Sequence, residues 1–592
     1  MNWRAHPRLA VMSVFAVAVI AVIFLWDWNW FRPLAEGYAS TALGREVRIR
    51  HFDLDVSRET RAVFEGVTIE NPPGFGGEKP LGTAERLSIN IRTWPALGGH
   101  IVIPEIRIEK PRGDLRSNGD GTRNWEFAGL GDSEDGRGGP PPEIGQLFIE
   151  DGNVHFADKK LGADFTVRAH TEAAKGKGEP MLVASATGIY NGQRIDANFR
   201  GGSLISLREE GKPYRVDLHG RNGDTKVSLQ GSLIDPLKLG GANVNLEIEG
   251  TTLDNLTPLI GVPLVATPPY RLKGRLDYAG EKVRFRNFSG SVGQSDLSGT
   301  IGVDPGDERP RVTGDLKSNR VVLADLGGFI GAVPGKADQP GLSEAQKAEH
   351  AAEEASPRLL PDQPFDIPEI RAADFDIHYE AARIEGRSMP LDDLVTTLRI
   401  ENGKVTLDPL NFGVGEGRIA GNIVLDARQS PIDVRADIDF QRVDLHRIMQ
   451  STEMFEGAGT IGGRGFIESS GNSVADMLGR GNGEIKLFMA GGNISALLVN
   501  LAGLDIGNSI LSALGLPQRT AIRCMVSDFA LEEGMLKTRT FYLDTEEANI
   551  VGKGTIDLAA ETLDYQIATE PKKPSIGAVP APIGITGRLK NP

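Results

Sequence analysis

The residues that could do chemistry are few in this sequence, and their spacing favours no reaction. The nine histidines form no His-x-x-x-His pair and none lies beside the single cysteine, Cys524, so the spacing of a zinc ligand set is absent. Gly457, Gly459 and Gly462 match a Gly-x-Gly-x-x-Gly pattern. A dinucleotide site needs a helix after that pattern, whereas the strand-like sequence Gly465-Phe-Ile-Glu follows it here. We therefore expect neither a bound metal nor a cofactor.

Two pairs of acidic residues resemble the paired carboxylates of a hydrolase. They are Asp374 with Asp376, and Asp437 with Asp439. In each pair the carboxylates alternate with apolar residues, so they fit the polar face of a half-buried strand better than a catalytic site. The sequence also contains no nucleophile elbow and no phosphate-binding loop. It therefore predicts a protein without catalytic residues that is not an enzyme.

Composition and charge narrow the class of partner. A chain of 592 residues is too long for one core, which favours several domains or one repetitive body. The net charge of −15 offers no basic surplus to displace counterions from phosphates, which excludes nucleic acid as a partner. The same charge disfavours broad adhesion to anionic lipid headgroups.

One segment is apolar enough to cross a membrane. Residues 9–26 carry no charge and would reach roughly 27 Å as a helix. Basic residues precede the segment, so residues 1–8 are expected in the cytoplasm and the rest of the chain on the far side. A cleaved signal peptide is the competing interpretation, but bulky tryptophans follow where small residues are expected. The predicted anchor residues are Leu9, Phe15, Ile20, Trp26, Trp28 and Trp30.

Beyond the anchor, apolar and polar residues alternate with a period of two, which is typical of strands with one apolar face. Turn residues separate these runs closely enough to favour an antiparallel meander. Three similar stretches begin at Lys282, Lys404 and Leu536. Each reads as a strand, a short connector, a strand broken by glycine, and a strand ending in an acid. A shorter echo recurs at Ile103-Pro-Glu-Ile106, Pro142-Glu-Ile144 and Ile367-Pro-Glu-Ile370.

The predicted fold is therefore mainly β, with an N-terminal transmembrane helix and an elongated, curled antiparallel β-sheet built from repeated units. A few short amphipathic helices are expected at 253–260, 323–330 and 445–449. Residues 494–516 are more apolar and fit either a buried helix or a helix at a membrane surface. The expected parts are a first β region (27–129), a linker (130–142), a repeat region (143–333), a second linker (334–364) and a second repeat region (365–592). For the second linker, disorder and a short helix over 344–354 remain equal alternatives.

The alternation also suggests a binding surface. If the repeats stack in register, their apolar side chains line up on one face and form a lengthwise groove. The candidate groove-lining residues are Val283, Phe285, Val405, Leu407, Ile556 and Leu558.

Both ends of the chain resemble a known family. At the N-terminal end the resemblance rests on the tryptophan-rich membrane exit, Leu43-Gly-Arg-Glu-Val47, Val67-Thr-Ile69-Glu-Asn-Pro72 and Asp120-Gly-Thr-Arg-Asn-Trp125. At the C-terminal end it rests on Ser473-Val-Ala-Asp-Met-Leu478, Leu501-Ala-Gly-Leu-Asp505 and Gly587-Arg-Leu-Lys-Asn-Pro592. These stretches resemble the AsmA family of bacterial envelope proteins, which are distant relatives of TamB-like proteins. The resemblance implies a bacterial inner-membrane anchor, a periplasmic β-rich body and a role in outer-membrane biogenesis.

Two functions remain open at this point. The first is phospholipid handling, with acyl chains in the apolar groove between the inner and outer membrane. The second is an assembly or structural factor that carries no lipid and influences outer-membrane protein assembly and protein targeting to the membrane. The partners implied are the lipid bilayer, phospholipid acyl chains and outer-membrane assembly components.

Overall fold

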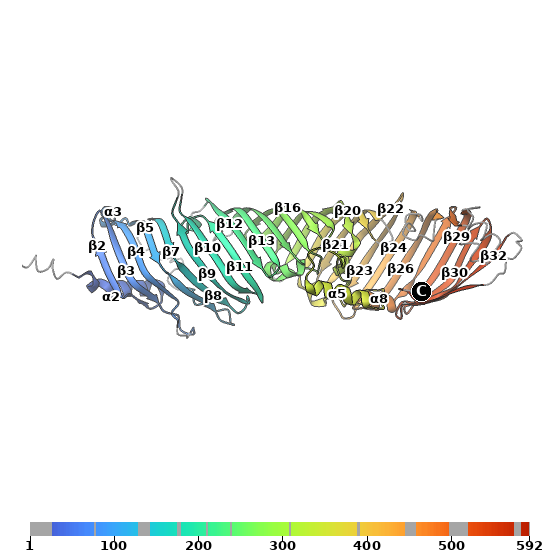
Figure 1. The fold of residues 1–592 in the computed structure, drawn as a ribbon, viewed down its shortest axis with the longest axis horizontal. Coiled ribbons are helices and arrows are strands. Elements are labelled where there is room, and N and C mark those ends of the chain that lie inside the picture. The colour runs from blue at the N-terminus through green and yellow to red at the C-terminus, as the bar shows by residue number, and fades with distance from the viewer. Residues whose placement is uncertain are drawn as a thin grey trace, which may run out of the picture. The chain divides into compact units, whose positions relative to one another are not determined.

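The computed structural model describes residues 27–75, 79–127, 143–174, 179–208, 211–236, 240–306, 309–386, 391–444, 457–495, 519–572 and 582–590. These residues belong to two compact units, residues 1–241 and 242–592, which we treat separately. The described part of the protein is mainly β, with 60% of the described residues in strands and few helices, as the period-two alternation predicted (Figure 1).

Unit 1 begins with a short helical segment and continues as a sheet. Its helices are η1 (Trp28–Phe31), α2 (Arg32–Leu43), α3 (Thr93–Leu97) and η2 (Ser206–Arg208). Its strands are β1 (Val47–Arg48), β2 (His51–Asp55), β3 (Glu59–Ile69), β4 (Gly82–Arg92), β5 (Val102–Glu109), β6 (Arg112–Ser117), β7 (Glu143–Glu150), β8 (Gly152–Asp158), β9 (Ala163–Glu172), β10 (Met181–Tyr190), β11 (Gln193–Gly201), β12 (Pro213–Asn222) and β13 (Thr225–Ile234).

Unit 2 contains the three repeats. Its helices are η4 (Leu253–Leu256), α4 (Thr257–Ile260), η5 (Leu323–Ile330), α5 (Glu344–Ala355), α6 (Ile367–Ala372) and α8 (Val474–Gly479). Its strands are β14 (Gly241–Gly250), β15 (Tyr270–Ala279), β16 (Lys282–Val292), β17 (Ser295–Asp304), β18 (Arg311–Ser318), β19 (Val321–Val322), β20 (Asp374–Glu385), β21 (Leu391–Glu401), β22 (Lys404–Val414), β23 (Gly417–Asp426), β24 (Ile432–Asp444), β25 (Gly457–Ala458), β26 (Thr460–Gly471), β27 (Asn482–Ala490), β28 (Asn493–Ser495), β29 (Arg519–Glu532), β30 (Met535–Thr545), β31 (Ala548–Asp557), β32 (Thr562–Pro571) and β33 (Ile583–Arg588).

The strands do not form a purely antiparallel meander, which corrects the prediction. In unit 1, β5 pairs with β7 and β6 with β8 in parallel. In unit 2, β18 and β19 both pair with β20 in parallel. A parallel pair needs a connection that returns the chain to the starting end of the strand. We call these pairings the parallel joints of unit 1 and unit 2, and both follow stretches that interrupt the sequence alternation.

Each repeat is a bulged strand followed by a hairpin and a second strand, namely β16–β17, β22–β23 and β30–β31. The predicted short connector is a β-bulge inside the first strand rather than a turn between two strands. The register shifts between Phe285 and Phe288, between Leu407 and Leu410, and across β30 after Lys537. Because bulges bend a strand and increase its twist, their recurrence favours a sheet that curls in the same sense in each repeat.

The predicted linker 334–364 is ordered, and the helical alternative matches the structure. Helix α5 begins with a capping box in which the Ser343 hydroxyl accepts from the Gln346 amide and the Gln346 side chain accepts from Ser343. Helix α6 has Asp366 as its N-cap. We call residues 331–373, which connect η5 to β20, the strap of unit 2. Within 334–364 the structure shows the short helix of the second alternative, and the Gln346 and His350 side chains of α5 are buried.

Several predicted segments lie outside the described residues. They are the membrane segment 9–26 with its residues Leu9, Phe15, Ile20 and Trp26, the linker 130–142, and the helical patterns at 445–449 and across most of 494–516. Among the helices that the structure does describe, none has the length and apolarity to cross a bilayer. The helical patterns at 253–260 and 323–330 correspond to η4–α4 and η5.

Candidate functional site: the apolar face of unit 2

The candidate groove-lining residues fall into shared rows across the sheet. Residues directly opposite each other in paired strands project from the same face. Phe285, Leu407 and Ile556 belong to one continuous row, which we call the first apolar row. The row runs through Val244, Leu276, Phe285, Ile301, Gly314, Ile377, Leu398, Leu407, Ile423, Ala436, Ile467, Gly483, Leu531, Leu536, Ile556, Leu563 and Gly587.

A second row lies beside the first and projects from the same face of the sheet. We call this face the apolar face. It contains the candidates Val283 and Val405, linked through Val303, Val312, Phe375 and Ile400. Val283 is 38% exposed, whereas Val405 is buried. Leu558 belongs to neither row, because it follows the last residue of β31 and its amide donates to the carbonyl of Gly534.

Parts of the apolar face are covered by the chain itself. Leu256 of η4 packs with Tyr270, Leu272 and Phe288, which are all buried. The stacked ring of Phe285 lies 4.9 Å from that of Phe288 and borders this cluster.

The loop after α4 and helix η5 extend this cover over the joint. Val262 is 1% exposed and packs on Val312 and Ile377, while Leu326 of η5 packs on the buried Val321 and Ile384. Farther along the sheet the same face is more open, since Ile485 and Ile585 are 37% and 38% exposed.

Glycines on the apolar face allow neighbouring strands to approach closely. A Cβ at Gly299 would lie 2.1 Å from the carbonyl oxygen of Asp315, and one at Gly421 would lie 2.4 Å from that of Asp437. These two glycines occupy the same place in the first and second repeats, where the sequence showed a strand broken by glycine. Their role is therefore steric, because any side chain would push the adjacent strand away.

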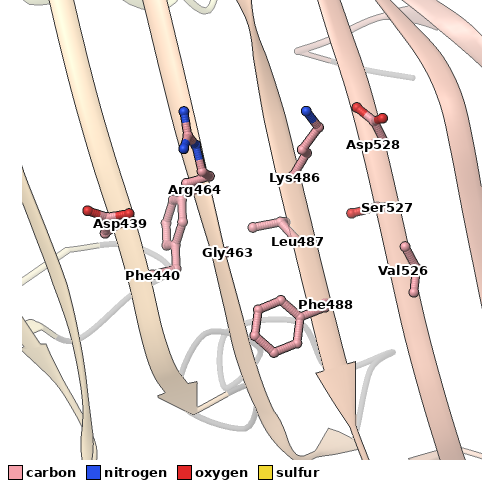
Figure 2. A pocket seen from close by; sticks show the side chains of 10 residues that line it. All are labelled: Asp439, Phe440, Gly463, Arg464, Lys486, Leu487, Phe488, Val526, Ser527 and Asp528. Carbon is pink, nitrogen blue, oxygen red and sulfur yellow. The ribbon is translucent and has the colours of Figure 1, made fainter.

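The opposite face of the sheet carries charged rows and one apolar row. Asp439, Arg464, Lys486 and Asp528 are successive cross-strand partners. The next row contains Phe488, Val526, Tyr542 and Val551, all at least 36% exposed. A hollow of about 540 Å³ lies between the two rows. Figure 2 shows its charged side chains on one side and Phe488 and Val526 on the other. Gly463, Leu487 and Ser527 also line the hollow, and along their strands they come between the charged row and the apolar row.

The acidic pairs of the sequence analysis lie in strands and have cross-strand or local partners. Asp374 accepts from the amide of Asn402, and Asp376 lies 3.9 Å from Arg399. Asp437 accepts from Arg435 at 3.2 Å, and Asp439 is paired in register with Arg464.

A further carboxyl group, that of Asp426, lies at the end of β23. The guanidinium of Arg428 donates to Asp426, which lowers the pKa of that carboxyl to about 2. Such pairs are typical of the solvated face of a sheet.

The glycine pattern of the sequence spans two strands. Gly457 lies in β25, and Gly462 lies in β26 with the ring of Phe488 over it. A strand follows the pattern where a dinucleotide site needs a helix. Among the residues that the structure describes, no three His, Cys, Asp or Glu side chains gather closely enough to hold a metal ion.

The described end of the anchor region exposes apolar side chains. Trp28 and Trp30 lie in η1, and Trp30 is 64% exposed. Helix α2 follows, starts with a proline in its first turn and ends at Gly44, whose φ of 62° is the usual left-handed C-cap. On α2, Leu34 and Tyr38 are 70% and 82% exposed. This helix was not expected from the sequence, although Pro33 and Gly44 are signals that could have indicated it.

A polar cluster at the joint of unit 1 was also missed. Asp114 on β6 is buried and faces its parallel partner His155 on β8. The His155 ring lies 2.9 Å from Asp114 through Nδ1 and 3.0 Å from Asp164 of β9 through Nε2. The hydrogen bonds to Asp114 and then Asp164 raise the pKa of His155. Burial alone would raise the pKa of Asp114, but hydrogen bonds from Arg116 and His155 outweigh it and lower that pKa.

Asn124 fixes the strand that carries this cluster. Its side chain is 1% exposed, donates to the Asp114 carbonyl at 2.8 Å and to Asn71, and accepts from the Arg116 amide. The neighbouring Trp125 ring lies 5.4 Å from that of Phe156. Asn124 and Trp125 close the stretch Asp120-Gly-Thr-Arg-Asn-Trp125 quoted above for the family resemblance. Their role at this position is structural.

Comparison with known proteins identifies the family. The model of the AsmA family matches residues 8–541, which is most of the chain. The chain belongs to the AsmA family. The resemblance noted at the two ends is thereby confirmed, and the match extends through the middle of the chain, where the sequence resemblance was diffuse.

A named protein of Escherichia coli is similar to this chain over its whole length. The chain is 31% identical over 637 aligned residues to the AsmA family protein YhjG of Escherichia coli strain K12, covering 100% of this chain and 92% of that relative. No solved structure matches the chain significantly. Membership of the AsmA family suggests an envelope-related function for this protein.

Proposed function

We propose that this AsmA family protein handles phospholipid in the bacterial envelope without catalysing a reaction. In this proposal residues 9–26 anchor it in the inner membrane as a single pass with a cytoplasmic N-terminus. The β-rich units lie in the periplasm, and acyl chains lie along the apolar face on their way between the inner and outer membrane. Its partners are then the bilayer and the acyl chains of phospholipid.

The observation that supports this proposal is the first apolar row. The row runs without a break from β14 to β33, and on the same face Ile485 of β27 and Ile585 of β33 are 37% and 38% exposed. Contiguous exposed apolar surface is uncommon on soluble proteins unless something binds there. An acyl chain that moved from water onto such a surface would gain about 0.8 kcal/mol for each buried methylene.

The alternative function is an assembly or structural factor that contacts outer-membrane assembly components and influences protein targeting to the membrane. Two observations favour it. The apolar face over β15–β21 is covered by η4, the loop after α4 and η5, so no lipid is needed there. The opposite face carries its own exposed apolar row at Phe488 and Val526, which suits a protein partner.

Photo-crosslinking from strand β27 separates the two functions. A photoreactive residue replaces Ile485 on the apolar face in one variant and Phe488 on the opposite face in the matched control. Both positions are exposed and apolar, so they differ in the face and not in hydrophobicity. Lipid crosslinks from position 485 alone would support lipid handling. Equal lipid labelling from both positions, or protein crosslinks without lipid, would favour the assembly factor.

A further inference from the structure

We infer that the strap, residues 331–373, is a closing device that keeps the sheet of unit 2 curled over its apolar face, and that Glu561 locks it. Strands β18 and β20 are parallel, so β18 finishes at one end of the strands and β20 begins at the opposite end. The strap connects these two ends. Its path therefore crosses from one side of the sheet to the other. Figure 1 shows α5 and α8 together along one edge of unit 2.

The first attachment lies at the loop between β14 and β15. The Gln346 side chain is buried and its Nε2 donates to the carbonyl oxygens of Thr251 and Thr267, at 3.1 Å each. The same side chain also completes the capping box at the start of α5. Gln346 therefore fixes both the helix start and its position on the loop.

The second attachment lies at the turn between β31 and β32. The Glu561 side chain is 6% exposed, and its Oε1 accepts from Arg358 Nε at 2.9 Å. Its Oε2 accepts from the backbone amides of Leu359 and Leu360. Lys590 donates to the carbonyls of Glu354 and Ser356, and the Ala475 amide donates to that of Pro361.

These two attachments are too close for a flat sheet. Between β15 and β31 the strand order would place the two turns roughly 60 Å apart, at about 4.8 Å for each strand. From Gln346 to Ala355 the helix spans about 14 Å, and the three residues from there to Arg358 add at most about 10 Å. Both attachments hold only if the sheet winds until its two sides approach each other. The strap then spans the remaining opening.

The strap lies on the apolar side of the sheet. Phe365, Ile367 and Ile370 pack against the buried cluster of Ala427, Ile432 and Met477, together with Leu425 and Val434 of the apolar face. Release of the strap would therefore expose apolar surface of β23 and β24. If lipid handling is correct, the strap regulates how much of the apolar face lipid can reach, and this consequence rests on the proposed function.

The conformation of Glu561 supports a role for its carboxylate. Its φ is 53°, a left-handed conformation that asparagine or glycine adopts more readily than glutamate. The turn itself is held by Asp557, which accepts from the amides of Ala559 and Ala560. Glutamate therefore occupies this position at a conformational cost, while its side chain satisfies three donors of the strap.

The test is hydrogen exchange of the full-length protein, followed by mass spectrometry of peptides covering 344–361. Glu561→Asn keeps the left-handed turn but is too short to reach the strap, and Arg358→Gln removes the partner while leaving the turn unchanged. Glu533→Asn is the matched control, because Glu533 has a φ of 48° in the β29–β30 turn and is exposed. We expect exchange at least tenfold faster in both strap variants and unchanged in the control.

Unchanged exchange in Arg358→Gln and Glu561→Asn would overturn the inference. The test is independent of lipid, because it measures the strap alone. Lipid labelling from position 485 is measured in the same variants. Faster exchange without any lipid labelling would uphold the closing device and count against the proposed function.

Discussion

The parallel joint of unit 1 is fixed from its polar side, whereas that of unit 2 is fixed from its apolar side. In unit 1 the buried Asp114 bonds His155 and Arg116 while Phe156, on the other side, stays partly exposed. In unit 2 the reverse holds. Val321 and Ile384 are 0% and 2% exposed, while the ion pair Lys317–Glu380 lies in solvent.

The difference shows that the chain segment connecting the two parallel strands determines which side of a parallel joint is buried. In unit 2 the connection begins with η5, whose Leu326 packs on Val321 and Ile384, so burial falls on the apolar side. In unit 1 the described start of the connection includes Asn124, which bonds the backbone of the joint strand β6 at Asp114 and Arg116.

The largest effect is expected from Ile384→Ala at the joint of unit 2. The truncation removes most of a 2% exposed side chain from a cluster that local repacking cannot refill, at a cost of about 2–4 kcal/mol. Hydrogen exchange in peptides of β20 and β21 should accelerate accordingly, with unit 1 unaffected. Val526→Ala, at a 45% exposed position, is the control and should cost under about 0.5 kcal/mol. Equal effects of the two substitutions would contradict an apolar lock.

The second effect is expected from Asn124→Ala in unit 1. The substitution leaves the Arg116 amide and the Asp114 carbonyl without their buried partner, which costs about 1–3 kcal/mol. The measurement is hydrogen exchange in peptides of β6 and β8. Asn118→Ala removes only an exposed bond to Thr122 and serves as control. If β6 exchanges as slowly in Asn124→Ala as in the unmodified protein, the joint does not depend on this side chain.

A smaller effect is the pH dependence of the joint of unit 1. Because the pKa of His155 is raised in the folded protein, its protonation stabilises the fold fully below the unfolded value of about 6.5. The contribution is lost as pH rises through the folded pKa. Exchange in β8 should therefore accelerate as pH rises through that value, after correction for intrinsic exchange. His155→Gln should remove this dependence, and a persistent dependence would assign it to another group.

The smallest effect is expected from Lys317→Ala on the solvated side of the joint of unit 2. Lys317 lies 2.9 Å from Glu380, but both side chains are well exposed, so water replaces the lost contact. Thermal unfolding should show no measurable change. A clear drop in Tm would mean that the joint of unit 2 also relies on its polar side.

The strands were predictable because alternation is a local property. The boundaries of the three repeats match β16–β17, β22–β23 and β30–β31 closely. The bulges were read as connectors because Asn287 and Asp408-Pro409 are residue types that favour turns. Only the neighbouring strand reveals that pairing continues on both sides of them. The echo at Ile103 and Ile144 marks a parallel pairing, since these two residues are direct partners in β5 and β7.

The rows of the candidate site could be predicted, whereas their exposure could not. Phe285, Leu407 and Ile556 align because strands of similar length and polarity fix the register. Val262 and Leu326 cover the same face from loops far away in sequence, so no local pattern indicates their contacts. The packing of the strap could not be predicted for the same reason, because Phe365, Ile367 and Ile370 pack on residues around 427–477.

The bulged hairpin also restricts how such a sheet can change length during evolution. In an antiparallel run each added strand reverses the direction of every strand after it, so insertion of one strand would move all later turns to the opposite side. Insertion of two, as in one repeat of β22–β23, restores direction, register and the side of each turn. A parallel joint is the exception, because it repeats a direction and so admits an odd strand. Antiparallel runs in the described part of unit 2 therefore lengthen in even steps, whereas the crossover between β18 and β20 allows parity to change.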